Sequence, residues 1–471
     1  MPIKRPFRKR AGTILAIIFL LLAAMQFIRP RLDNPPVTAD LSAPAPVKEI
    51  IKRACYDCHS NETGLAWFDQ PVPAYWMVVS HVKDGRKVLN FSNWDSLSKD
   101  QQAGKLFESL NQVEFNVMPL KQYAWFHHGA RITPGEKAVL RQYLYTLAPK
   151  LIPDTAKMKA ADGQYAKWIQ VATTAGGIRS SARGGSELSS AGVQPSSNGV
   201  AYIPGYADWT AISTTQRFDN GTMRVIFGND IAIKAIREGH TNPWPRGATF
   251  AKVAWDQLID STGEVHTGVF KQVEFMIRDN EQYSSTDGWG WGRWRGMQLT
   301  PYGKDASFTM ECTNCHKPMQ DNDHVFTMPI PDTLSLYDQA AILPDSLASH
   351  PLKGKVISSF VDQKEGTMST LYGNDIAVNS ARTGQTAYPA GSVISLVTWS
   401  QREDGHWFGA RIPEAILSVE QIIFKTTADG ITQPNYKKYE GMPLKEKADA
   451  DPGAIRNRIM YMVSRKASVI P

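Results

Sequence analysis

Cysteine is scarce in this sequence, with four in 471 residues, and none is left over for a disulfide. All four lie in two copies of one motif, C-x-x-C-H, at residues 55–59 and 312–316. A disulfide-stabilised scaffold needs paired cysteines in addition to those of such motifs. Once both motifs are committed to a cofactor, the sequence excludes structural disulfides.

The spacing of C-x-x-C-H has a specific chemical use. Two thiols one helical turn apart reach the two vinyl groups of one haem, and the adjacent histidine becomes the proximal iron ligand. A thioredoxin-like redox pair needs no histidine, and a four-cysteine zinc site leaves both histidines unexplained. The sequence therefore predicts two covalently bound haem c groups, held by Cys55, Cys58, His59, Cys312, Cys315 and His316.

The chain has no excess of charge outside its first 31 residues. Seven of its 52 Lys and Arg residues precede Asp33, the first acidic residue, and the other 45 balance the 45 Asp and Glu residues. A nucleic-acid-binding protein typically carries a basic patch on its folded body. The net charge of +7 therefore belongs to the N-terminus, and we expect no nucleic-acid partner.

Long apolar runs are absent except for residues 12–28, which are interrupted only by Thr13 and Gln26. At about 1.5 Å per residue, this run just spans a hydrocarbon core of about 30 Å. The five basic residues before it and two after it favour a cytoplasmic N-terminus. A cleaved signal peptide is the alternative, but no small-residue cleavage pattern follows. We expect a cytoplasmic tail over residues 1–10, a transmembrane signal anchor over 11–29 in the inner membrane, and a body on the periplasmic side.

The composition predicts three further segments. Five prolines in residues 30–46 indicate a stiff spacer. Helical periodicity begins at Val47, and a capping box at residues 133–136 begins another apolar helix, so residues 47–150 are expected to form a mostly α c-type haem domain. Residues 151–199 are expected to be a linker, because Gly, Ser and Ala dominate their second half.

The remainder of the chain repeats itself. Gly-Thr-Met and Gly-Asn-Asp-Ile-Ala occur at 221–223 and 228–232, and again at 366–368 and 373–377. The offset of 145 residues becomes 144 after a one-residue gap, and six further positions match: Arg237, Gly239, Thr241, Pro245, Gly247 and Trp255 with Arg382, Gly384, Thr386, Pro389, Gly391 and Trp399. The sequence predicts two β-rich (α+β) copies of one domain, over 200–331 and 332–471, the second without a haem motif.

A sixth ligand for the first haem is open to four candidates. Met118 precedes a proline, as axial methionines often do in electron-transfer cytochromes, and a thioether ligand raises the iron potential. The alternative role for Met118 is core packing, as one of 15 methionines. His81, His127 and His128 are the competing ligands. We favour Met118.

Two resemblances to known families follow from these motifs. Residues 47–148 resemble a small exported haem-binding domain through C-Y-D-C-H, the aromatic stretch at 67–76, His81-Val82, Asn90-Phe91-Ser92 and Met118-Pro119. Residues 200–331 resemble cytochrome P-460, a c-type haem family that oxidises hydroxylamine, through the stretch around residues 311–317 and Val325-Phe326-Thr327. The expected fold class is therefore multidomain: a transmembrane helix, a mostly α haem domain and two β-rich P-460-like domains.

The resemblance to cytochrome P-460 also implies roles for three residues. In that family a lysine is bonded to a porphyrin meso carbon, and Lys252 occupies its position after Gly247. Glu274 matches the distal carboxylate, for which we expect a raised pKa in an apolar haem pocket. Arg224 matches a pocket arginine that stabilises negative charge. The second copy has Leu396 and Ser369 in place of the lysine and the arginine, and Glu414 is the candidate opposite Glu274.

The resulting expectation is an oxidoreductase. The haem with an open site oxidises hydroxylamine, and electrons pass through the first haem to an exported electron-transfer carrier. The alternatives are a module that binds or detoxifies nitric oxide, as in the related cytochrome c′-β, a redox sensor, and a peroxidase. A bonded Lys252 favours oxidation and a free one favours gas binding. The substrate is a small nitrogenous molecule, the membrane is contacted through the N-terminal helix, and a homodimer is left open.

Overall fold

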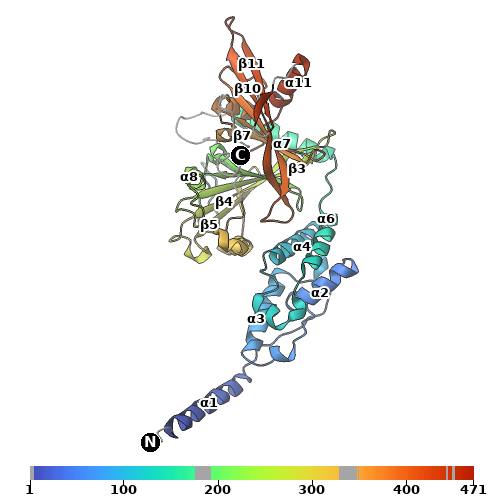
Figure 1. The fold of residues 1–471 in the computed structure, drawn as a ribbon, viewed down its shortest axis with the longest axis vertical. Coiled ribbons are helices and arrows are strands. Elements are labelled where there is room, and N and C mark those ends of the chain that lie inside the picture. Colours follow the sequence, from blue (N-terminus) through green and yellow to red (C-terminus); the bar gives the residue numbers. More distant parts are fainter. Residues whose placement is uncertain (1–4, 175–191, 328–346, 348–349, 442–443, 448–450) are drawn as a thin grey trace. The chain divides into compact units, whose positions relative to one another are not determined.

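The computed structural model describes residues 5–174, 192–327, 347, 350–441, 444–447 and 451–471 (Figure 1). The chain divides into two compact units, Met1–Ala148 and Pro149–Pro471. The first is helical and contains the first C-x-x-C-H motif. The second is dominated by strands and contains the second motif.

The prediction of a transmembrane anchor is wrong. Helix α1 (Arg5–Met25) begins with four basic residues among its first six and ends three residues before Ile28. Its apolar part, residues 11–25, is roughly 22 Å long at about 1.5 Å per residue, which is short of a hydrocarbon core of about 30 Å. In the part of the chain that the structure describes, no helix has the length and apolar character needed to cross a membrane. The predicted single-pass anchor in the inner membrane is therefore not supported.

Four helices build the core of the first unit, and a short fifth joins them. They are α2 (Ala45–His59), α3 (Ala74–Val88), α4 (Lys99–Glu114), α5 (Lys121–Phe126) and α6 (Pro134–Leu147). The predicted helical faces are confirmed, since Val47, Ile50, Ile51 and Ala54 are buried on α2. The predicted capping box is confirmed as well, because the Thr133 hydroxyl accepts from the Glu136 amide at the start of α6.

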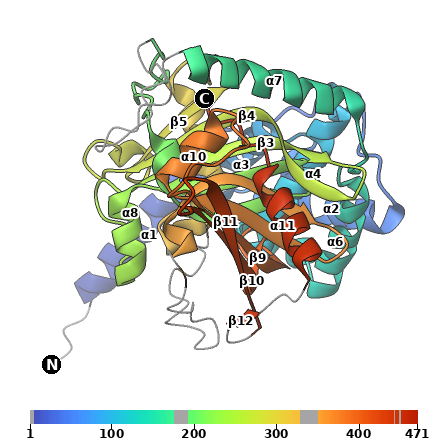
Figure 2. The same ribbon diagram turned by 90° about the horizontal axis from the view of Figure 1, so that it is seen from above.

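The second unit is organised around a closed antiparallel sheet. Its strands are β1 (Thr210–Arg217), β2 (Thr222–Gly228), β3 (Thr249–Ile259), β4 (Glu264–Arg278), β5 (Trp289–Arg295), β6 (Thr300–Pro301), β7 (Lys355–Asp362), β8 (Thr367–Gly373), β9 (Val393–Glu403), β10 (Ala410–Thr426), β11 (Thr432–Glu440) and β12 (Lys445–Lys447). The order is β1-β2-β3-β4-β7-β8-β9-β10, and β10 pairs back with β1. Helix α7 (Thr155–Thr174) lies along β4, where Gln164 accepts from the Phe270 amide at 2.7 Å (Figure 2). It occupies much of the segment expected to be a linker, whose residues 175–191 lie outside the described residues.

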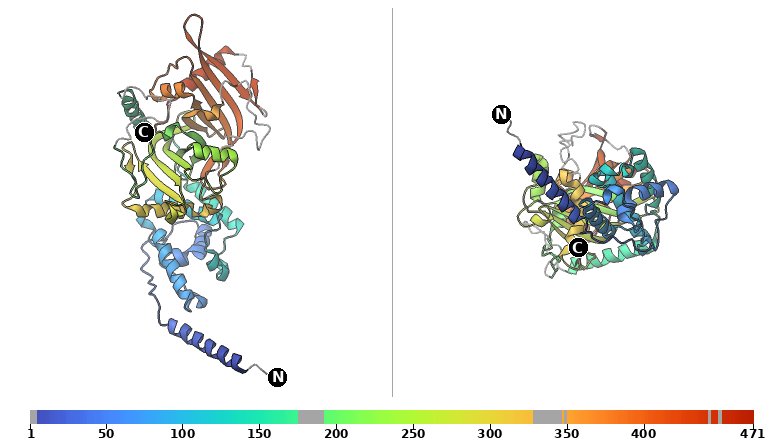
Figure 3. Two further views of the ribbon diagram at one scale, coloured as in Figure 1. Left: turned by 90° about the vertical axis from the view of Figure 1, so that its left-hand side faces the viewer. Right: turned by 90° about the horizontal axis from the view of Figure 1, so that it is seen from below.

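The internal repeat is visible in the element order. Strands β1 and β2, helix α8 (Asp230–Glu238) and strands β3 and β4 recur as β7, β8, α10 (Asp375–Arg382), β9 and β10, in two groups of strands that Figure 3 separates by colour. Asn229 and Asn374 each cap their helix with a side-chain oxygen and donate to a glycine carbonyl, that of Gly247 at 2.9 Å or Gly391 at 2.8 Å. The repeated Gly-Asn-Asp motif therefore has the same structural role in both repeats, which is to cap a helix.

Alternation along the strands gives the first repeat two different faces. Val253, Trp255 and Phe275 point into the large core that both repeats share. Residues of the opposite parity, such as Phe250 and Met276, join a smaller cluster with Trp291, against which Cys312 packs. Successive side chains on a strand point to opposite faces. The second C-x-x-C-H motif therefore lies on the outer face of the first repeat's sheet.

Candidate functional site

The first C-x-x-C-H motif lies at the end of helix α2, whose last residue is His59. Its Nδ1 atom lies 3.1 Å from the carbonyl oxygens of both Gly85 and Leu89 at the end of α3. A carbonyl oxygen only accepts hydrogen bonds, so Nδ1 carries the proton and Nε2 keeps a lone pair. A histidine oriented in this way is ready to ligate a metal through Nε2.

Gly85 brings α3 against this motif. A Cβ atom at this position would lie 2.7 Å from the Cys58 carbonyl oxygen and 3.3 Å from Cε1 of His59. Burial raises the pKa of the Cys55 thiol to about 12 and that of the Cys58 thiol to about 11. A zinc site needs three or four protein ligands, and the described residues contain no group of three or more His, Cys, Asp or Glu side chains that could hold a metal ion. These observations favour haem over zinc.

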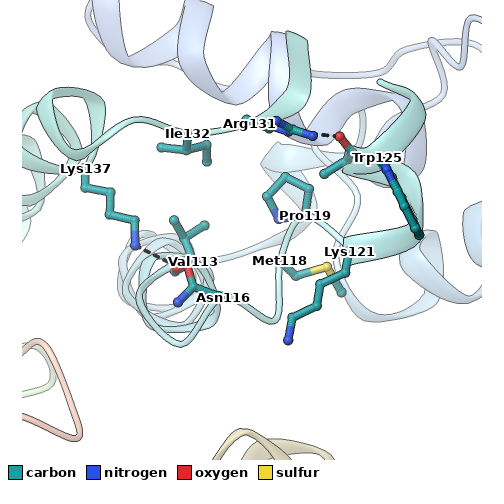
Figure 4. A pocket seen from close by; sticks show the side chains of 10 residues that line it. Val113, Asn116, Met118, Pro119, Lys121, Trp125, Arg131, Ile132 and Lys137 are labelled. Carbon is teal, nitrogen blue, oxygen red and sulfur yellow. Dashed lines mark hydrogen bonds between the residues drawn. The ribbon is translucent and has the colours of Figure 1, made fainter. Parts of the chain in front are cut away.

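The four candidate sixth ligands have different surroundings. His127 is engaged at both nitrogens, by Asp69 at 3.0 Å and by the Tyr123 carbonyl at 3.2 Å. His128 is exposed and His81 is half-buried. Met118 lines a cavity of about 290 Å³ (Figure 4), together with Val113, Asn116, Pro119, Lys121, Ala124, Trp125, Arg131, Ile132 and Lys137.

Met118 is therefore the one candidate of the four in the lining of this cavity. The lining, as the structure describes it, contains none of the three residues of the first haem motif. Met118 as the axial ligand thus stays a prediction.

The second motif lies on helix α9 (Thr309–His316), and the following loop orients its histidine. Nδ1 of His316 donates to the His324 carbonyl oxygen at 2.7 Å. Asp323 and His324 have φ values of 47° and 66°, in the left-handed region that non-glycine residues seldom adopt. Arg278 holds this loop through an ion pair of 3.1 Å with Asp323, and both side chains are buried.

Two aromatic rings flank the His316 imidazole. The Trp291 ring centroid lies 4.6 Å from that of His316, and the Phe326 centroid lies 4.9 Å away in an edge-on arrangement. Burial lowers the pKa of His316 to about 4, so its imidazole is neutral at neutral pH. The neutral ring, with Nδ1 occupied, leaves Nε2 for iron, as at the first motif.

The predicted Lys252 and Glu274 are directly opposite each other on β3 and β4, and they form an ion pair. Across the next pair of strands, Glu274 is opposite Arg293 of β5, whose Nε atom lies 3.1 Å from the carboxylate. The Gln272 amide donates to the same carboxylate. The structure therefore brings Lys252 and Glu274 together, and their charges reach far enough to shift the pKa values of Cys312 and His316.

The expected raised pKa of Glu274 is wrong. Burial alone raises the pKa of this carboxyl, but Lys252, Arg293 and Arg224 outweigh burial and hold the pKa well below its ordinary value. The pocket is charged where the sequence indicated an apolar one. Burial, together with Arg224 and Arg293, lowers the pKa of the Lys252 amine in turn.

Arg224, on β2, is the third predicted pocket residue. Burial and the charge of Arg217 lower the pKa of its guanidinium to about 9. Its Nε atom is buried and has no hydrogen-bond partner among the described residues, and the same holds for the indole nitrogen of Trp291. Buried donors without a partner also occur outside this site, for example at Trp168 and Trp399, so the two in this pocket are compatible with a bound polar group but do not by themselves require one. With Nε2 of His316 and two cysteines on α9, these residues fit a haem.

Arg293 is the pocket residue that sequence reasoning missed. It follows Trp291 by two positions on β5, so both side chains share one face of the strand. Arg293 also stacks on the Tyr302 ring at 4.6 Å. The period-two pattern of Trp289, Trp291 and Arg293 was the available signal, although only the pairing of β4 with β5 brings it to Glu274.

The second repeat has its own carboxylate at the Glu274 position. Glu420, and not Glu414, is opposite Leu396 on β9 and β10, in the register that pairs Glu274 with Lys252. Strands β4 and β10 contain the same irregularity, but the turn before β10 (residues 404–409) is longer than the turn before β4 (residues 260–263), so the repeat offset of 144 residues does not carry Glu274 to Glu420. Glu420 is 3% exposed and is held by Arg458 of α11 (Pro452–Val463) and by the Tyr436 hydroxyl at 2.6 Å. The partners of the Glu420 carboxylate are therefore side chains of the second repeat itself.

Comparison with known families agrees with the two haem motifs. Residues 20–146 match a family model described as a haem-binding domain, and residues 203–327 match one described as cytochrome P460. The chain joins a haem-binding domain to a cytochrome P460 domain. The predicted fusion is confirmed, and haem is the cofactor that both families imply. No curated protein matches the chain.

The P460 domain contains every residue of the second site described above, from Arg224 to Phe326. Its match ends before β7, so the assignment of the second repeat as another P460 domain stays a prediction. The haem-binding domain contains both the first motif and Met118.

Proposed function

We propose that this chain is a cytochrome with two covalently bound haem c groups, in which the P460 domain oxidises hydroxylamine and the haem-binding domain relays the electrons. The observation that carries the proposal is the partly buried ion cluster of Lys252, Glu274 and Arg293, whose charges act on His316. The second repeat has no C-x-x-C-H motif, and it also has Leu396 in place of the lysine. The haem motif and this lysine are thus present together in one repeat and are both lacking in the other.

A bound haem would supply the redox-active iron at which the nitrogen of hydroxylamine is oxidised. Oxidation of hydroxylamine releases protons, and Glu274 is the carboxylate placed to accept one. Arg224 and Arg293 are the cations that stabilise negative charge in the same pocket. The resulting division of labour assigns proton transfer to β4 and charge stabilisation to β2 and β5.

Lys252 has the surroundings of a reactive lysine. Burial and two neighbouring arginines lower the pKa of its amine and outweigh Glu274, which raises that pKa, so the fraction of the nucleophilic neutral form increases. A covalent bond from Nζ to the porphyrin would remove the positive charge of this amine. Glu274 would then lose one of the cations that hold its pKa down, and would become a better proton acceptor near neutral pH.

The proposed function is tested by Glu274→Gln in the full-length holoprotein, assayed for hydroxylamine-dependent reduction of ferricyanide. Because the amide accepts no proton at this pH, we expect the rate to fall by about 10²-fold or more while the haem content stays unchanged. Lys271→Gln is the matched control, since Lys271 is on the same strand but exposed. An unchanged rate in Glu274→Gln, or no oxidation by the wild-type holoprotein, would contradict the proposal.

Nitric oxide binding without turnover is the second candidate, and the ion pair of Lys252 with Glu274 favours it. This pair gives the lysine a stable partner that requires no bond to the porphyrin. If Lys252 stays free, the same pocket offers donors to a bound gas molecule and no altered haem. The state of Lys252 therefore decides between the two functions.

A further inference from the structure

A turn of the second repeat reaches the histidine of the haem motif in the first repeat. The two repeats differ in the hairpin after their third strand: residues 260–263 join β3 to β4, whereas residues 404–409 join β9 to β10. The longer turn contains His406, Trp407 and Phe408, and the shorter one contains no aromatic residue. The turn of the first repeat therefore shows that two such strands can be connected without these aromatic residues.

The longer turn is fastened to the end of β1. The Gly409 carbonyl accepts from the amides of Phe218 at 2.9 Å and Asp219 at 3.2 Å. Gly409 has a φ of 107°, and a Cβ atom there would lie 2.7 Å from that of Asp219. The Trp407 indole donates to Asp219 at 3.0 Å, and the Arg217 guanidinium lies 4.5 Å from the Trp407 ring.

The fastened turn ends on Phe326. Nδ1 of His406 donates to the Phe326 carbonyl oxygen at 2.7 Å. The Phe326 ring lies edge-on to Trp407, with centroids 5.5 Å apart, and edge-on to His316 at 4.9 Å. A continuous series of contacts therefore leads from the second repeat, through Phe326, to the imidazole of the haem motif.

We propose that His406 and Trp407 are positioning residues for the proximal histidine, and that the second repeat thereby tunes the potential of the haem in the P460 domain. The inference rests on the proposed haem at the second motif. It gives the repeat without a haem motif a role in the chemistry of its neighbour: its turn fixes Phe326, and Phe326 covers one side of His316.

The physical reason is the sensitivity of haem potentials to solvent and to the orientation of the axial ligand. Residues that support a metal ligand orient it, and their apolar surfaces keep water away from it. Water near the iron favours the more highly charged ferric state and so lowers the reduction potential. Removal of the cover over Phe326 is therefore expected to lower the potential of this haem and leave that of the first haem unchanged.

The test is a spectroelectrochemical titration of the full-length holoprotein in which residues 404–409 are replaced by Asp-Ser-Thr-Gly, the turn of the first repeat. This replacement keeps the hairpin and removes only the aromatic extension. Trp407→Ala and His406→Ala remove one contact each. Trp407→Phe keeps the ring and His406→Asn keeps a donor at the Nδ1 position, so both are expected to restore the wild-type potential in part.

Ser261→Ala, in the exposed turn of the first repeat, is the matched control and should leave the titration unchanged. We expect the turn replacement to change the ferrous-to-ferric ratio of the second haem several-fold at a fixed applied potential. If a haem is attached at the second motif and its potential is the same in all variants, the positioning role is wrong while the proposed function stands. If no haem is attached at that motif in the wild type, the proposed function itself fails.

Discussion

Glu274 shows how much of a residue's chemistry depends on its neighbours across the sheet. Its position on a strand, on the same face as Gln272 and Met276, could be predicted from the sequence. The match of Lys252 to a lysine of the cytochrome P-460 family could be predicted as well. The lowered pKa of the carboxyl could not be predicted from the sequence, because Arg293 reaches it only through the pairing of β4 with β5. Three cations around this partly buried carboxylate lower its pKa against the effect of burial.

At the residue scale, Lys252 gives the most informative prediction. If it is bonded to the porphyrin, a tryptic digest should contain a haem peptide that joins the segment around Lys252 to the segment around Cys312. The reduced protein should show a strongly red-shifted Soret band, because a bond at the ring edge alters the macrocycle. Lys252→Leu introduces the residue of the second repeat and should abolish both signals while the haem stays attached. A digest without the joined peptide would instead support the gas-binding function.

At the scale of elements, the crossing of α2 and α3 is set by Gly85. Gly85→Ala should destabilise the haem-binding domain and reduce haem attachment at the first motif, because its Cβ would lie 2.7 Å from the Cys58 carbonyl. The measurement is thermal unfolding together with the haem content. Gly104→Ala on α4 is the matched control, because nothing lies within 4 Å of its Cβ, and it should stabilise its helix by about 1 kcal/mol. Equal effects of the two substitutions would refute the steric account.

Secondary-structure elements were predicted best where the local spacing of residues determines them. The apolar face of α2 and the capping box of α6 follow from local spacing, and the repeat follows from matching residues. The end of helix α1 was predicted wrongly, because an apolar run alone does not determine the residue at which its helix ends. Glu414 was aligned in place of Glu420 because the turn at 404–409 is longer than the turn at 260–263, and an alignment that lacks the strand register does not show where the extra residues lie.

At the scale of the whole second unit, the two repeats pair at both edges and close the sheet. Residues 216–217 of β1 pair with residues 410–411 of β10, and residues 264–266 of β4 pair with residues 360–362 of β7. These pairings join corresponding strand ends of the two repeats. No local pattern in the sequence predicts that the sheet closes in this way. The closure of the sheet brings the turn at 404–409 to Phe326.

The second repeat should be stable without a cofactor, because its own side chains satisfy Glu420. Arg458→Ala should lower the free energy of unfolding of the second unit by about 1–3 kcal/mol, since it leaves the buried Glu420 carboxylate without its cation while the Tyr436 hydroxyl still donates to it. Replacing both Arg458 and Glu420 by leucine should recover much of that loss. Chemical denaturation measures both effects, and a small effect of the single substitution would show that Glu420 does not depend on this pair.

The count of covalently bound haems tests the account most directly. The measurement is the intact mass of the protein matured with a c-type haem attachment system, in three forms: wild type, Cys55→Ala with Cys58→Ala, and Cys312→Ala with Cys315→Ala. The account predicts two haems in the wild type and one in each variant. A wild-type protein with a single haem, or with none, would contradict it.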